Sequence, residues 1–192
     1  ITDFEFFLRN SKPMKHQQTL GNNGTMKHLE RTRKIINLGL KLGWMNQNPF
    51  ESFKLRFVRN ERGFLTEIEL AAIENEIFNI ERLRTVRDIF VFSCYTGLSY
   101  IDMINLSPRD ISLGIDNQFW ININRQKTNT SVKIPLLPKA LEILKEYRLH
   151  PKSVSLNKIF PKISNQKLNN YLKEIADYIG IKKNFTFHLA RH

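Results

Sequence analysis

Apolar residues recur at helical spacing over most of the chain. Between residues 26 and 45, the apolar positions that roughly follow a helical period are Leu29, Ile36, Leu38, Leu40 and Leu42. The segment predicts a long helix with Thr25 as its N-cap and Gly43 near its end. Residues 3–10 are typical of the end of an earlier helix, and residues 11–24, rich in Gly, Asn and Lys, predict a loop between the two.

Four more helices are predicted further along the chain. Residues 66–69, Thr-Glu-Ile-Glu, form a capping box whose side chains satisfy backbone amides at the start of a helix that continues to residue 78. Another helix is predicted over residues 83–95. Pro138 opens a third that runs to residue 149, and the last covers residues 165–179 and stops at Gly180.

The periodicity changes after Pro108. Residues 119–124 and 131–137 alternate apolar and polar side chains, and the polar residues RQKTNT separate them. This pattern predicts two antiparallel strands joined by a short polar turn, and residues 110–114 add a candidate third strand. The predicted fold class is therefore mainly α with a small antiparallel β-sheet (α+β).

A basic segment without clear periodicity, residues 54–65, follows the first helices and contains Gly63. We place a domain boundary in this segment. A helical domain is predicted over residues 1–58 and a second domain over residues 59–192, which suits a chain of 192 residues.

The charge balance narrows the choice of partner. The chain has 30 Lys plus Arg against 18 Asp plus Glu, a net charge of +12. Such an excess favours a polyanion, most simply nucleic acid, because counterion release from phosphates drives binding. A generally basic, solvated surface is the alternative, and charge alone does not choose between the two.

Several functional classes are disfavoured by composition. Cys94 is the only cysteine and lies in an apolar run, so we expect a small core residue and neither a disulfide framework nor a cysteine-based zinc site. No stretch approaches the roughly 20 apolar residues that span a bilayer. The first residues, ITDFEFFLRN, lack the basic start of a signal peptide. We therefore expect a cytoplasmic protein without a membrane partner.

Cationic side chains near the end of the chain suggest phosphate chemistry. His188 and Arg191 are three apart on a predicted helix with Thr186 as a plausible N-cap, so they share a face. A guanidinium fork and an imidazole together can grip a phosphate. A solvated pair is the alternative, because many surface helices contain this spacing by chance.

A second cation stands at the tip of the predicted hairpin. Lys127 is there either a solvated turn residue or a general acid that can protonate a leaving oxygen. Arg125, two residues earlier, is predicted to point to the same side if both lie on a strand. Ser99, before Tyr-Ile-Asp102, is predicted to cap a helix through a capping box with Asp in place of Glu.

Taken in order, these motifs resemble the tyrosine recombinases, or phage-type integrases. The resemblance rests on TGLSYIDMINLSPRDI, on RQKT before VKIPLLP, on FHLARH, and on NPFESFKL at the end of the first domain. It implies a helical core-binding (SAM-like) domain followed by a truncated catalytic domain that lacks its C-terminal nucleophile segment. Integrases of Bacteroides-type mobile elements are the most similar group, because some of them place Ser where others have Arg.

The resemblance implies a definite reaction on double-stranded DNA. A tyrosine attacks a phosphodiester, forms a 3′-phosphotyrosyl link, and a 5′-hydroxyl later reverses the step, with no metal or nucleotide cofactor. Arg191 and His188 would hold the non-bridging oxygens, and Lys127 would protonate the leaving 5′-oxygen. The full-length protein would form a tetrameric synapse on DNA in the bacterial nucleoid, and this chain would be a monomer in solution.

Two departures from the family pattern change the expectation. Ser99 stands where most members have an arginine, whose charge is worth roughly 10³–10⁵ in the rate of phosphoryl transfer. We expect Arg125 to supply the missing guanidinium, with a solvated or backbone-binding strand residue as the alternative. Tyr171 and Tyr178 precede the FHLARH motif, where a nucleophile is not expected, so the chain is predicted to bind DNA without cleaving it.

Further basic residues are candidates for contacts with DNA phosphates. They are Lys27, Arg31, Arg33, Lys34 and Lys41 on the long helix, and Lys54, Arg56 and Arg59 in the linker. Together they would let the first domain close a clamp on the duplex through contacts that are independent of sequence. The alternative for each is a solvated cation. Two other functions stay open: a non-catalytic DNA-binding protein on the same scaffold, and a helical protein-interaction module.

Overall fold

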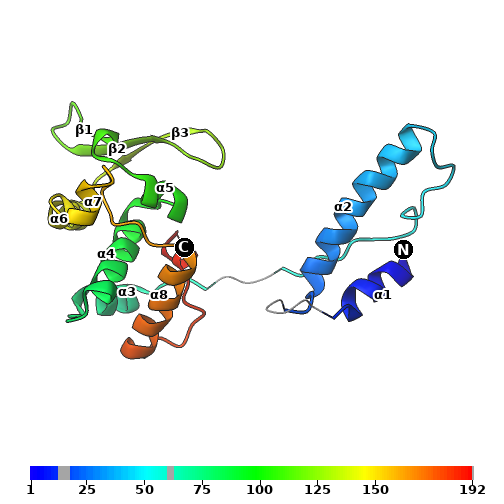
Figure 1. The fold of residues 1–192 in the computed structure, drawn as a ribbon, viewed down its shortest axis with the longest axis horizontal. Coiled ribbons are helices and arrows are strands. Elements are labelled where there is room, and N and C mark those ends of the chain that lie inside the picture. Colours follow the sequence, from blue (N-terminus) through cyan, green and yellow to red (C-terminus); the bar gives the residue numbers. More distant parts are fainter. Residues whose placement is uncertain (13–17, 60–62, 192) are drawn as a thin grey trace. The chain divides into compact units, whose positions relative to one another are not determined.

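The computed structural model describes residues 1–12, 18–59 and 63–191 (Figure 1). Its contacts divide the chain into two compact units, Ile1–Glu61 and Arg62–His192. The boundary predicted between residues 58 and 59 lies near this division. In the part of the chain that the structure describes, no helix is long and apolar enough to cross a membrane.

The first unit is built on two helices, α1 (Thr2–Asn10) and α2 (Asn22–Lys41). Its small core comprises Met26, Leu29 and Phe50. The long helix starts three residues before the predicted N-cap, because Gly21 holds the cap position. Thr25 is instead buried in the first turn, where its hydroxyl donates to the Gly21 carbonyl at 3.2 Å, a bond within the helix rather than a cap.

The second unit holds the remaining helices. The α-helices are α3 (Glu67–Asn75), α4 (Glu81–Thr96), α5 (Tyr100–Asn105), α6 (Pro138–Tyr147), α7 (Pro151–Val154) and α8 (Asn165–Ile179); the 3₁₀ helices are η1 (Pro108–Asp110) and η2 (Phe187–Arg191). The capping box predicted at Thr66 is confirmed, with the Glu69 amide donating to the threonine hydroxyl. Gly180 ends α8 with φ +85°, a conformation that side-chain-bearing residues rarely adopt.

A three-stranded antiparallel sheet confirms the alternating pattern. It consists of β1 (Ile111–Leu113), β2 (Phe119–Asn124) and β3 (Ser131–Pro135) in that spatial order. Ile121 of β2 pairs with Ile111 on one side and Ile134 on the other, and it is fully buried. The fold class, mainly helical with a small antiparallel sheet, is confirmed.

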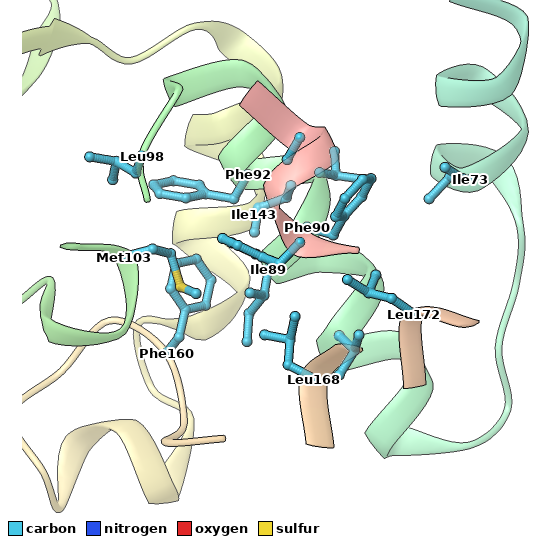
Figure 2. Packing of buried hydrophobic residues seen from close by; sticks show 14 of the residues in the cluster. Ile73, Ile89, Phe90, Phe92, Leu98, Met103, Ile143, Phe160, Leu168 and Leu172 are labelled. Atoms are coloured by element: carbon cyan, nitrogen blue, oxygen red, sulfur yellow. The ribbon is translucent and has the colours of Figure 1, made fainter. Parts of the chain in front are cut away.

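The core of the second unit forms around α4, which packs against α3, α6, α8 and η2 (Figure 2). Phe90 meets Phe185 with ring centroids 4.9 Å apart, and Phe92 meets Phe160 at 5.0 Å. Burial on this scale is the main stabilising term for such a unit. Cys94 is half-buried beside this core, and desolvation raises the pKa of its thiol to about 12.

Candidate functional site

The TGLSYID motif forms a tight connection between two helices. Gly97 adopts φ +64° and ends α4, which lets the chain turn at once into α5. Ser99 is the N-cap of α5, and its hydroxyl oxygen accepts the Asp102 amide at 3.4 Å. The serine hydroxyl also donates to Asp102 Oδ2 at 2.6 Å. Ser99 therefore does act as a helix cap.

The predicted capping box is only half present, because the Asp102 carboxylate has other donors. Its Oδ2 takes the Ser99 hydroxyl, and its Oδ1 accepts the backbone amide of Gln126 at 2.9 Å. Asp102 is 8% exposed, so this bond is well shielded from water. A second bond, from Asn105 Nδ2 to the Gln126 side-chain oxygen at 3.3 Å, reinforces it. The hairpin loop is thus fastened to α5.

The loop between β2 and β3 carries both hairpin cations. Arg125 donates its amide to the Thr130 carbonyl at 2.9 Å, and its own carbonyl accepts the Asn129 amide at 2.7 Å. Asn129 adopts φ +52°, which asparagine tolerates better than most residues. Lys127 is exposed at the turn. Arg125 and Lys127 do not share a strand, because β2 ends at Asn124 and both residues lie in the loop, so the common orientation expected for two strand residues does not follow.

Residues Phe187–Arg191 of the FHLARH motif form η2 rather than an α-helix, and the last residue of the motif lies outside the described part of the chain. Residues three apart eclipse one another in a 3₁₀ helix, so His188 and Arg191 still lie on one face, and both are exposed. Phe187 anchors this segment: its ring lies 6.0 Å from that of Tyr100, and its amide donates to Asn169 Oδ1 at 2.7 Å. The carbonyl of Thr186 accepts the Leu189 amide at 2.9 Å.

The first turn of α5 contacts two segments that carry predicted site residues. Tyr100 contacts Phe187, next to His188, and Asp102 holds Gln126, next to Lys127. An open hollow of about 780 Å³ lies beside this turn; its polar lining includes Asp102, Asn105, Arg109, Asn122, Asn124 and Gln126. Arg109 is exposed there, and sequence analysis did not single it out.

The basic residues of α2 fall into two groups. Lys27, Arg31, Lys34 and Lys41 are exposed, and their spacing places them on one face of the helix. Arg33 faces the core instead: its Nη2 donates to the Phe53 carbonyl at 2.6 Å.

Two further contacts refine this picture of the first unit. The Arg33 guanidinium lies 5.1 Å from the centre of the Phe50 ring, which ties it to the packing of the unit. Lys27 pairs with Glu30 at 2.9 Å, so its charge is partly compensated. Arg31, Lys34 and Lys41 are the cations of α2 best placed to meet an external anion.

The basic linker is attached to the first unit along part of its length. Asn22 donates to the Arg56 carbonyl at 2.8 Å, and Asn23 exchanges two hydrogen bonds with the backbone of Val58. Lys54, Arg56 and Arg59 are exposed. Lys54 and Arg56 line a hollow of about 610 Å³. In the described residues, no group of three potential metal ligands is present.

Comparisons with known proteins agree with this architecture. Residues 1–55 match the family model of the phage integrase SAM-like domain. No curated protein matches the chain significantly. Among solved structures, a lambda integrase dimer bound to a COC′ core site has a TM-score of 0.72 at 15% identity, covering 88% of this chain and 62% of that one.

Two further structures are similar at the same level. The Tn1549 transposon integrase in complex with circular intermediate DNA has a TM-score of 0.70 at 15% identity, covering 90% of this chain and 65% of that one. XerH site-specific recombinase bound to palindromic difH substrate has a TM-score of 0.63 at 18% identity, covering 100% of this chain and 56% of that one.

The chain spans between half and two thirds of the length of these structures. At such low identities the similarity establishes the fold. Residues 1–55 therefore match the phage integrase SAM-like family, and the chain shares the fold of these solved integrases and recombinases.

Proposed function

We propose that this chain is the DNA-binding and phosphate-activating region of a site-specific DNA recombinase, or integrase. The full-length protein would cleave and rejoin DNA strands through a 3′-phosphotyrosyl intermediate. The SAM-like domain, the fold and the net charge of +12 all favour duplex DNA as the partner. No metal or nucleotide cofactor is required by this mechanism.

One observation carries the proposal: the first turn of α5 contacts both segments that bear the predicted catalytic cations. Tyr100 holds η2 through Phe187, and Asp102 holds the hairpin loop through Gln126. Charge develops on the phosphoryl oxygens in the transition state, and fixed donors stabilise it. His188 and Arg191 would bind the non-bridging oxygens, and Lys127 would protonate the leaving 5′-oxygen.

Arg125 is the proposed substitute for the arginine missing at position 99. The Ser99 hydroxyl is committed to Asp102 and carries no charge. Arg125 is half-buried and adjoins Gln126, the residue that Asp102 holds. Its guanidinium would supply the cationic donor from the loop instead of from the helix. The Arg125→Ala variant of the full-length protein should lose strand cleavage, whereas unchanged cleavage would exclude this role.

We further propose that none of the five tyrosines of this chain is the nucleophile. Tyr100 donates to the Ile163 carbonyl at 2.6 Å, and Tyr147 donates to buried Asp88 at 2.9 Å. A hydrogen bond with Glu74, together with burial, raises the pKa of Tyr95 to about 12.

The two tyrosines of α8 are also engaged in packing. Tyr171 lies under the Arg82 guanidinium at 4.8 Å, and the ring of Tyr178 packs on Phe78 at 5.7 Å. Each tyrosine therefore has a structural partner. The 192-residue chain would bind DNA without cleaving it, and covalent trapping of a nicked duplex by this chain would contradict the proposal.

The biological setting follows from the same reasoning. We propose an integrase of a Bacteroides-type mobile element, because Ser99 matches a substitution found in that group. The protein would act in the bacterial cytoplasm, on the nucleoid. The full-length protein would assemble as a tetramer on two duplexes, and the chain described here would be a monomer in solution.

The second candidate is a DNA-binding protein that uses the same scaffold without catalysis. The engagement of Ser99 with Asp102 favours it, because the first turn of α5 then presents no cation of its own. Trapping by the full-length protein on a nicked suicide substrate separates the two. A covalent adduct that Lys127→Ala and Arg191→Ala abolish supports the recombinase, whereas tight binding without an adduct supports the non-catalytic protein.

A further inference from the structure

A second hollow in the Arg62–His192 unit shares no lining residue with the one beside α5. It has a volume of about 580 Å³ and is formed by four segments: the start of α4, the junction of α6 and α7, residues 161–164 and the first half of α8. Its polar lining includes Thr85, His150, Lys152, Lys162, Ser164 and Lys167.

Three of these side chains carry positive charge that no carboxylate of the described residues pairs with. Lys152, Lys162 and Lys167 are all exposed, and none has a carboxylate within ion-pair distance among the residues that the structure describes. Like charges around one hollow repel each other in the absence of an anion. The three lysines therefore favour an anionic ligand.

The other charged residues of the lining are already engaged. Arg82 makes two hydrogen bonds to Glu174, at 2.6 and 2.9 Å, and stacks on Tyr171. Glu81, the one carboxylate in the lining, lies 3.7 Å from His150. These charged lining residues are thus held by contacts within the protein, and the three lysines are the charged groups available to bind a ligand.

The hollow adjoins the candidate catalytic elements. Ile163, one of its lining residues, accepts the hydroxyl of Tyr100 through its carbonyl at 2.6 Å. The Tyr100 ring in turn packs on Phe187 at the start of η2. A single residue of α5 therefore contacts both the edge of the hollow and the segment that carries His188 and Arg191. An extended polyanion bound at His188 and Arg191 would therefore also pass beside the hollow. This proximity favours an extended polyanion over a small anion as the ligand of the hollow.

We propose that Lys152, Lys162 and Lys167 bind the phosphodiester backbone of duplex DNA flanking the candidate site. The inference rests on the proposed function, since duplex DNA is its ligand. The α8 dipole, which begins at the Ser164 N-cap, adds to the attraction for phosphate. Because the contacts are to phosphates, they supply affinity and register without reading sequence.

The test compares salt dependence between two triple variants of this chain. The hollow variant is K152Q/K162Q/K167Q, and the control is K145Q/K173Q/K182Q, which removes the same charge at exposed lysines outside the hollow. Binding to a duplex of arbitrary sequence is measured by fluorescence anisotropy between about 50 and about 200 mM salt. Circular dichroism checks that both variants fold.

For the hollow variant, the slope of log affinity against log salt should be smaller in magnitude by about 0.9 for each phosphate that is no longer neutralised. The control variant should keep a slope close to that of the wild type. Equal slopes for the two variants would overturn the inference and leave DNA binding itself intact. A wild-type chain that fails to bind duplex at low salt would instead overturn the proposed function.

Lysine acetylation gives a second readout that needs no variant. Duplex DNA should protect Lys152, Lys162 and Lys167 from acetylation, relative to Lys145 and Lys182 in the same sample. Protection of only the control lysines, or no protection of any lysine, would contradict the inference. This readout uses the wild-type chain, so it holds even if the triple variant did not fold.

Discussion

The backbone amide of Gln126 donates a 2.9 Å hydrogen bond to the buried carboxylate of Asp102. The two residues are 24 positions apart, and the bond joins the hairpin loop to α5. Removal of a buried charged acceptor leaves its donor unsatisfied, which costs about 1.5–3 kcal/mol. This single bond therefore matters both for the stability of the second unit and for the position of Lys127.

The first prediction concerns this bond. Asp102→Ala should lower the free energy of unfolding by about 1.5–3 kcal/mol, because the Gln126 amide and the Ser99 hydroxyl both lose their acceptor. Asp102→Asn should cost less, since its amide oxygen can still accept one of them. Chemical denaturation measures the difference, and Asp177→Ala, an exposed carboxylate on α8, is the control. An equal, small effect for all three variants would contradict the account.

The second prediction concerns the helix cap at Ser99. Ser99→Ala should destabilise the second unit by about 1 kcal/mol, because the first turn of α5 loses a side-chain acceptor. Ser99→Thr should retain most of the stability, since threonine also caps helices. Ser99→Arg should be destabilising to a similar extent as Ser99→Ala, because arginine also lacks a side-chain acceptor. Thermal unfolding of the three variants tests the ranking, and an arginine variant as stable as wild type would refute it.

The third prediction separates two arginines of α2. Arg31→Gln should reduce the salt slope of duplex binding by about 0.9 and leave stability unchanged, because Arg31 is exposed on the basic face. Arg33→Gln should leave the slope unchanged and lower stability by about 1.5–3 kcal/mol, because its guanidinium bonds the Phe53 carbonyl. Anisotropy and denaturation on the same two proteins check both parts. The same salt slope and the same stability for the two variants would contradict this prediction.

The fourth prediction concerns the reactivity of Cys94. Burial raises the pKa of its thiol from the ordinary 9.0 to about 12, so the folded protein holds the thiol proton more tightly than the unfolded chain. The resulting stability is fully present below pH 9 and is lost as the pH rises from about 9 towards 12. Alkylation at about pH 8 should therefore be slow in the folded protein and fast in denaturant. Fast labelling of the native chain would contradict this.

Local features were predictable because short-range chemistry decides them. The capping box at Thr66, the turn-forming Gly180 and the alternation that forms β2 and β3 each depend on residues close in the chain. The helix start was missed by four residues because Gly21 can cap as well as Thr25.

Long-range features were not predictable from the pattern. Arg33 stands in the same basic run as Arg31, and only the fold reveals that one faces Phe53 and the other faces solvent. The hollow of Lys152, Lys162 and Lys167 is assembled from segments distant in the chain. The Asp102 carboxylate accepts the distant Gln126 amide instead of the Ser99 backbone amide that a capping box would use. The sequence pattern predicts only the local contact.

The short helix α5 has a mechanical consequence. Its first turn holds the hairpin loop through Asp102 and η2 through Tyr100 and Phe187. Because one six-residue helix holds both attachments, we expect the two cation-bearing segments to be displaced together rather than independently.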